Sequence, residues 1–122
     1  MFDRVTIRVS DFEASKRFYT TVLGPLGHEL GWEDAERQLA EWGDFSIARD
    51  DKPLTENVHV AFATARRDEV DAFHRAALEA GFRDNGAPGE RAEYHPGYYG
   101  AFVLDPDGNN IEAVFHDRRQ AG

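Results

Sequence analysis

Cysteine is absent from this 122-residue sequence, and so are long apolar runs. Without cysteine the chain has no disulfides, no thiolate chemistry, no Cys-ligated zinc and no iron–sulfur cluster. No apolar stretch approaches the roughly 20 residues of a membrane-spanning helix, and the N-terminus has no basic segment followed by an apolar one, as a signal peptide would have. We therefore expect a cytoplasmic protein that does not contact membranes.

Basic residues are too few and too scattered for nucleic-acid binding. The chain has 14 Lys and Arg against 23 Asp and Glu, which gives a formal net charge of −9. Contacts to phosphates need clustered Lys and Arg, so small-molecule chemistry and protein contacts are the classes that remain. With 41% hydrophobic residues, a chain of this length can bury a core without staples, and we assign residues 1–122 to a single domain.

The first part of the sequence predicts a strand, a helix and further short strands. Residues 5–9 alternate between apolar and polar side chains, which is typical of a half-buried strand. Ser10 and Glu13 have the spacing of a capping box, so we expect a helix to begin there and to end at Gly24. Three short strands are expected between residues 30 and 49.

The same order of elements returns 55 residues later. A strand over 58–63 and a helix that stops at Gly81 are followed by expected strands over 82–84, 98–104 and 110–115. The matched apolar pairs are Val5 with Val60, Ile7 with Phe62, Phe18 with Phe73 and Leu23 with Leu78. We interpret the chain as an internal duplication with modules 1–55 and 56–118, and we expect residues 85–96 to form the longest loop, a common place for function.

In a module of this size the helix covers only one face of the sheet. The other face carries polar or small residues where a core would need large apolar ones: Arg4, Thr6, His59 and Ala61. Two such sheets set face to face would form an open half-barrel lined by these side chains. The pattern therefore predicts a small-molecule pocket.

Several segments together resemble the vicinal oxygen chelate superfamily, which includes glyoxalase I, extradiol dioxygenases and bleomycin-binding proteins. The segments that carry the resemblance are residues 4–11, Phe18-Tyr19, Leu23-Gly24, residues 58–62 and the closing Asp105-Pro106-Asp107-Gly108-Asn109-Asn110-Ile111-Glu112. The resemblance implies an α+β fold of two βαβββ modules, which form curved mixed sheets around a pocket. It also implies a homodimer, often with modules exchanged between the chains.

The family's metal site takes one side chain from the first and one from the last strand of each module. His59 and Glu112 match the family's ligands in the second module. In the first module Arg4 takes the place of the first histidine, and Ser46 or a neighbour takes the other position. One histidine and one carboxylate hold a divalent metal poorly, and a fixed guanidinium repels one.

Three interpretations follow from this pattern. In the first, the pocket works without metal and Arg4 supplies the positive charge, paired with Glu112 or with a substrate oxyanion. In the second, His95 completes a His59/His95/Glu112 site for Zn, Ni, Mn or Fe, as in a metal-dependent lyase or dioxygenase. In the third, the pocket is vestigial and the protein binds a partner. Phe102 stands where the extradiol enzymes have a catalytic tyrosine, so we do not expect ring cleavage.

Our leading hypothesis is a small-molecule-binding protein or enzyme of the glyoxalase, bleomycin-resistance and dioxygenase type, with a degenerate metal site. As an enzyme it would use Glu112 as a general base beside an enolisable carbonyl, with Arg4 and His59 stabilising the oxyanion. The residues that we assign to ligand contacts are Arg8, Ser46, His95, Tyr98 and Phe102. A non-catalytic protein that sequesters an aromatic or cationic drug is the alternative from another class.

Overall fold

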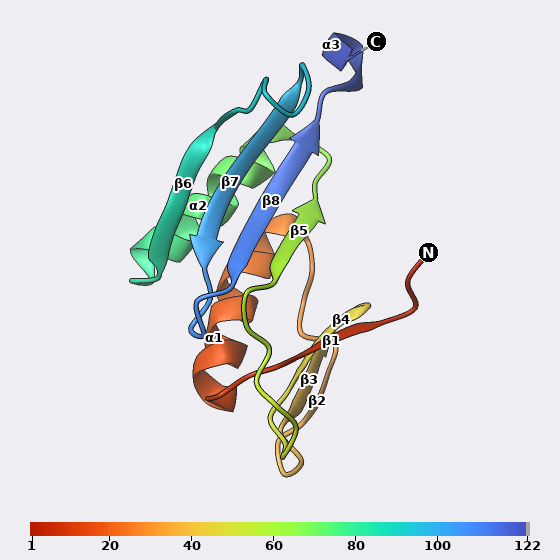
Figure 1. The fold of residues 1–122 in the computed structure, drawn as a ribbon, viewed down its shortest axis with the longest axis vertical. Helices are drawn as coiled ribbons and strands as arrows, with labels where there is room; N and C mark the ends of the chain where they lie inside the picture. The colour runs from red at the N-terminus through yellow and green to blue at the C-terminus, as the bar shows by residue number, and fades with distance from the viewer. Residues whose placement is uncertain (122) are drawn as a thin grey trace.

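The computed structural model describes residues 1–121, which form two four-stranded mixed sheets, each covered on one face by a helix (Figure 1). Residue 122, the last of the expected domain, lies outside the described residues. The first half contains β1 (Val5–Arg8), α1 (Phe12–Leu23), the short 3-10 helix η1 (Gly24–Leu26), β2 (Trp32–Asp34), β3 (Leu39–Trp42) and β4 (Phe45–Ala48). The second contains β5 (His59–Ala63), α2 (Arg67–Glu79), β6 (Arg83–Glu90), β7 (Tyr98–Leu104), β8 (Asn110–His116) and the terminal α3 (Arg118–Ala121). The two βαβββ units and the α+β class are confirmed.

The internal repeat is visible in the strand order and in the register. The sheets have the orders β1-β4-β3-β2 and β5-β8-β7-β6, and in each the first strand is parallel to the last. Thr6 pairs with Ser46 in the first sheet, and Ala61 pairs with Glu112 in the second. Because Thr6 and Ala61 are 55 residues apart, Ser46 occupies the position that corresponds to Glu112.

One hydrophobic core joins the two halves where α1 and α2 pack together. Phe18 and Leu23 of α1 and Phe73 of α2 are fully buried in it. Leu78, which the repeat aligns with Leu23, is instead 40% exposed. The apolar side of α2 runs through positions 70, 73 and 77, and Leu78 lies one residue beyond this stripe.

The N-terminus of α1 differs from the expected capping box. Asp11, not Ser10, is the N-cap, and its side chain accepts a hydrogen bond from the backbone N–H of Ala14 at 3.1 Å. The hydroxyl of Ser10 donates to Asp107, far along the chain. Asp and Ser are similarly good N-caps, so the long-range contact decides which of the two neighbours caps the helix.

Strand β6 extends to Glu90, well beyond the expected end at residue 84, so part of the expected loop is a strand. Its pairing with β7 shifts register between Asp84 and Gly86 and again between Gly86 and Gly89. An edge strand with bulges can be rich in glycine and proline, as loops are. For this reason the sequence pattern predicted a loop where β6 continues to Glu90.

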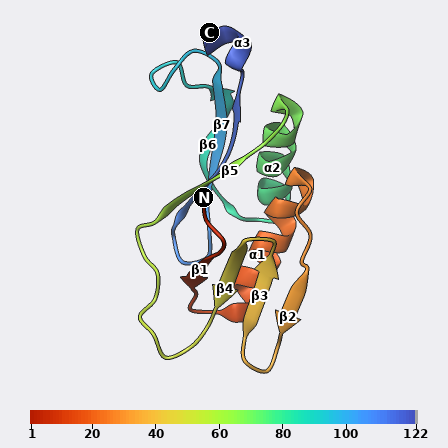
Figure 2. The ribbon, with the colours of Figure 1, turned by 90° about the vertical axis from the view of Figure 1, so that its right-hand side faces the viewer.

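The uncovered faces of the two sheets point in different directions within the chain. Figure 1 shows the broad face of the second sheet while the first sheet is seen nearly edge-on, and Figure 2 shows the reverse. The expectation that the sheets face each other is therefore not met within a single chain. No helix in the described part of the chain is both long and apolar enough to cross a membrane.

Candidate functional site

Glu112 lies at the centre of the uncovered face of the second sheet. It is fully buried, although the face around it is open, because β5 and β7 flank β8 on both sides. His59 Nε2 donates to its Oε1 at 2.7 Å, and the hydroxyl of Tyr98 donates to its Oε2. A buried carboxylate is costly unless it is paired, and these two donors supply the pairing.

Gly100 on β7 makes the space that Glu112 occupies. A Cβ atom at position 100 would lie 2.9 Å from Glu112 Oε2 and 3.3 Å from Tyr98 Cε1. Gly100 is not among the residues that we predicted for the site. The available signal was a glycine inside a predicted strand, which often marks a close approach by another group.

The two donors to Glu112 differ in their contact with solvent. The side chain of His59 is 52% exposed, so an entering ligand can reach it, and its ring covers Oε1 of the fully buried Glu112. Burial, followed by the hydrogen bond to Glu112, raises the pKa of Tyr98 well above its usual value, so its hydroxyl stays protonated and donates. A carboxylate held by one fixed donor and one accessible donor can accept a proton from a bound molecule.

An aromatic surface with a cation lies beside this group. Phe102 on β7 is the register partner of Glu112, so the two side chains share a face, and its ring centroid is 6.1 Å from that of His59. The Arg91 guanidinium carbon lies 5.4 Å from the centre of the Phe102 ring. Arg91 lies in the segment 85–96 that we expected to be a loop, and no sequence pattern predicts that it lies here.

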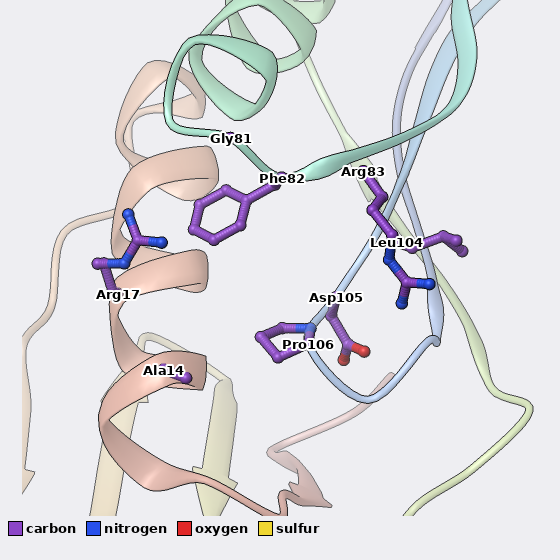
Figure 3. A pocket seen from close by; sticks show the side chains of 8 residues that line it. All are labelled: Ala14, Arg17, Gly81, Phe82, Arg83, Leu104, Asp105 and Pro106. Atoms are coloured by element: carbon purple, nitrogen blue, oxygen red, sulfur yellow. The ribbon is translucent and has the colours of Figure 1, made fainter.

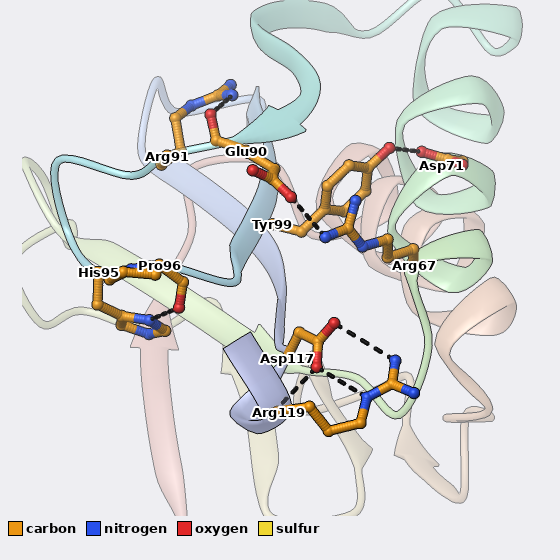
Figure 4. A network of polar contacts seen from close by, with 9 residues as sticks. All are labelled: Arg67, Asp71, Glu90, Arg91, His95, Pro96, Tyr99, Asp117 and Arg119. Atoms are coloured by element: carbon orange, nitrogen blue, oxygen red, sulfur yellow. Dashed lines mark hydrogen bonds and ion pairs between the residues drawn. The ribbon is translucent and has the colours of Figure 1, made fainter. Parts of the chain in front are cut away.

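His95 joins His116 rather than His59 and Glu112. His95 Nε2 lies 2.9 Å from His116 Nδ1. The Nδ1 of His95 donates to the carbonyl oxygen of Pro96 at 2.7 Å (Figure 4). Burial, and then the nearby Arg118 and His95, lower the pKa of His116.

The donor groups of the described residues do not assemble a site for a metal ion within one chain. Within residues 1–121 no group of three or more His, Asp or Glu side chains is arranged to hold one. The trio His59, His95 and Glu112 is not assembled, because both ring nitrogens of His95 are engaged elsewhere. We therefore derive no chemical step through a metal.

The first sheet keeps its candidate residues apart from Glu112. Arg4 Nε lies 3.4 Å from Glu41 Oε2, and Arg8 Nε lies 3.4 Å from Asp50 Oδ2. Ser46 is buried and shares a 2.6 Å hydrogen bond with Thr6. Of the two partners expected for Arg4, Glu112 and a substrate oxyanion, Glu112 is not in contact with it. Among the candidate residues, all within 1–121, the fold brings together His59, Tyr98, Phe102 and Glu112.

A separate surface pocket lies between α1, the start of β6 and the turn after β7 (Figure 3). Arg17 stacks on the ring of Phe82 there, with its guanidinium carbon 4.5 Å from the ring centre. The lining residues are Ala14, Arg17, Gly81, Phe82, Arg83, Leu104, Asp105 and Pro106. None of the residues that the sequence assigned to function is among them.

The family model that matches the sequence and a similar solved structure point to the same superfamily. The model of the Glyoxalase/Bleomycin resistance protein/Dioxygenase superfamily matches residues 1–113. A glyoxalase/bleomycin resistance protein from Albidiferax ferrireducens T118 is 32% identical, with a TM-score of 0.81 over 94% of this chain and 98% of that one. No curated protein matches the sequence significantly.

More distant structures share the fold alone. A glyoxalase/bleomycin resistance protein/dioxygenase family enzyme from Burkholderia phytofirmans PsJN is 21% identical, with a TM-score of 0.69 over 93% of this chain and 97% of that one. The oxidase ChaP-H2 is 22% identical, with a TM-score of 0.68 over 100% of this chain and 98% of the other.

Proposed function

The chain belongs to the glyoxalase/bleomycin resistance protein/dioxygenase superfamily, and from that premise we propose that it is a metal-independent enzyme acting beside a carbonyl. Glu112 would remove a proton from the carbon next to the carbonyl of a small molecule. The observation that carries this proposal is the Glu112 carboxylate, fully buried and held by His59 and Tyr98 where the family's metal ligand would stand.

The oxyanion that forms after proton abstraction needs a positive or hydrogen-bonding partner. His59 is half-exposed and can turn its Nε2–H from Glu112 toward a developing enolate oxygen. Arg4 is also exposed, with 57% of its side chain accessible, but within the chain it pairs with Glu41, so we propose that it contributes to the site from a second copy of the chain. The chemistry proposed for the single chain therefore rests on Glu112 and His59, with Arg4 as the contribution of an assembly.

Retention of activity after metal removal tests this proposal. We expect the protein, dialysed against EDTA, to catalyse exchange of α-protons for deuterium in a panel of 2-oxo acids, β-keto acids and α-hydroxyketones, measured by ¹H NMR. Adding Zn²⁺, Ni²⁺, Mn²⁺ or anaerobic Fe²⁺ should leave the rate unchanged. Activity that appears only with one of these ions would favour the metal-dependent lyase or dioxygenase, and binding without exchange would favour a drug-sequestering protein.

We also propose a homodimer, because both sheets leave an edge and a face uncovered. β1 and β5 end their sheets and have no neighbour on one side, and such edges readily pair with another chain. Between them lies an apolar hollow lined mainly by Phe2, Val5, Phe45, Val60, Ala61 and Phe62. Phe2 is 69% exposed in the single chain, and a second copy of the chain would cover it together with this hollow.

Substituting the exposed edge of this hollow should break the dimer. For the wild type we expect a mass of twice 13.8 kDa in light scattering after size exclusion. Val5→Lys combined with Phe2→Lys places two charges in the apolar hollow and should give the mass of one chain. Leu78→Lys is the matched control, because Leu78 is an exposed apolar residue on α2, and it should stay dimeric. A monomeric wild type would contradict the proposal.

A further inference from the structure

Arg91 is a cation on the open face of the second sheet that has no carboxylate partner within residues 1–121. Its guanidinium donates to the backbone oxygen of Ala87 at 2.7 Å and, more weakly, to that of Glu90 at 3.4 Å. The side chain of Glu90 is taken by Arg67, at 2.6 Å (Figure 4). Since a guanidinium has five N–H groups, several donors of Arg91 remain available.

The strand beside Arg91 is built to receive this side chain. A Cβ atom at Gly89 would lie 2.9 Å from Arg91 Nη1, and one at Gly86 would lie 3.5 Å from Nη2. Gly86 pairs with Phe102, on whose ring the guanidinium stacks. The two glycines and the ring therefore fix the guanidinium over β6 and β7.

Arg91 lies on the same open face of the second sheet as Glu112. Phe102 and Glu112 are directly paired across β7 and β8 and share the open face, so the guanidinium that covers Phe102 lies on that face too. Burial and Glu112 raise the pKa of Tyr98, and Arg91 opposes them, so the charge of Arg91 acts on the hydroxyl that holds Glu112. An anchored cation thus lies near the proposed general base.

We propose that Arg91 binds the carboxylate of the substrate, and that the substrate is a small carboxylic acid with an aromatic or apolar group. A guanidinium binds a carboxylate through two parallel hydrogen bonds in one plane, and Arg91, which has no carboxylate partner among the described residues, has donors free for this contact. Phe102 supplies the apolar surface. In a chain with a net charge of −9, a local anchor is needed to hold an anion next to Glu112. This inference rests on the proposed function in one respect, that the substrate binds beside Glu112.

The test compares phenylacetate with its neutral amide, phenylacetamide, by NMR titration of the full chain. We expect the wild type to bind the acid roughly tenfold more tightly than the amide, as charge-assisted hydrogen bonds would give. Arg91→Gln should remove this preference and Arg91→Lys should keep part of it. Arg67→Gln is the matched control, because Arg67 also stacks on a ring of β7, that of Tyr99 at 4.7 Å, yet it is paired with Glu90.

A wild type that binds the acid and the amide equally, or an Arg91→Gln variant that still prefers the acid, would overturn the inference. Gly89→Ala keeps the charge but moves the guanidinium, so it should reduce the preference even if Arg91→Gln folds poorly. Binding is measured without turnover, so the two proposals fail separately. Preference for the acid without deuterium exchange refutes the general base alone, and exchange without that preference refutes the role of Arg91 alone.

Discussion

Replacing Asp105 by Ala should lower the free energy of unfolding by about 4 kcal/mol, a large part of the stability of a domain of this size. The carboxylate is 1% exposed and accepts a hydrogen bond from the Tyr19 hydroxyl at 2.6 Å. It also accepts from the backbone N–H of Asp107 at 3.0 Å and of Asn109 at 2.8 Å. Ala at position 105 would leave these donors without a partner, most of them buried. Urea denaturation followed by fluorescence of the buried Trp42 measures the loss.

Two other variants show whether the loss comes from buried hydrogen bonds. Asp107→Ala alters the same turn, but its carboxylate accepts only from the exposed Ser10, so we expect a loss of about 1 kcal/mol or less. Tyr19→Phe removes one donor and should cost about 1–2 kcal/mol, less in the Asp105→Ala background than alone. Equal losses for Asp105→Ala and Asp107→Ala would contradict this explanation.

The same turn shows what local sequence can and cannot predict. The run 105–109 predicts a hairpin, and it does join β7 to β8. Its second role spans the chain: the Asn109 side chain accepts from the backbone N–H of Val58 at 3.0 Å and donates to the carbonyl of Thr55 at 3.1 Å. These contacts hold the segment between the two modules against the turn, and no periodicity or local motif records them.

Hydrophobic alternation and the 55-residue repeat were enough to predict the two modules and those strands that are rich in apolar residues. The family resemblance placed Ser46 or a neighbour at the position that corresponds to Glu112, and the register of β1 with β4 identifies that residue as Ser46. The part of β6 beyond residue 84 was missed because its pairing comes from an irregular edge rather than from side-chain alternation. The direction of the two open faces depends on how α1 and α2 pack, which a strand pattern does not specify.

For the candidate site, the sequence found the paired His59 and Glu112 through the family positions that they match. It assigned Tyr98 to ligand contact, which stays a prediction, and the structure adds that the Tyr98 hydroxyl donates to Glu112. Gly100 and Arg91 were missed for a common reason. Gly100 makes room for Glu112 because it has no side chain, and Arg91 lies over the sheet where Gly86 and Gly89 leave space for its guanidinium. Both effects arise from neighbouring strands; the glycine inside a predicted strand was a local signal for Gly100, and Arg91 had none.

Glu112→Gln should lower the rate of catalysed deuterium exchange by about 10²–10⁴-fold, the usual contribution of a positioned acid or base. Glutamine keeps the size of the side chain and can still hydrogen-bond to His59 and Tyr98, so the fold should survive. It cannot accept a proton from substrate carbon. The rate is followed by ¹H NMR on the carbonyl compound that exchanges with the wild type, and a folded variant with an unchanged rate would remove Glu112 from the mechanism.

Asp84→Asn provides the matched control for this loss. Asp84 forms a second His–carboxylate pair in the same module, with His74 Nε2 2.9 Å from its Oδ1. That pair is closer to the surface at the carboxylate, which is 51% exposed, and it contacts α2 rather than the open face. The hydrogen bond from His74 lowers the pKa of Asp84, so the pair stabilises the fold above the unfolded carboxyl pKa, and this contribution falls as the pH drops through the folded value. Asp84→Asn should therefore change the stability of the protein at acid pH, while its deuterium exchange rate stays at the wild-type value. The comparison shows whether exchange is lost with any histidine-paired carboxylate or only with Glu112, the one that acts on substrate.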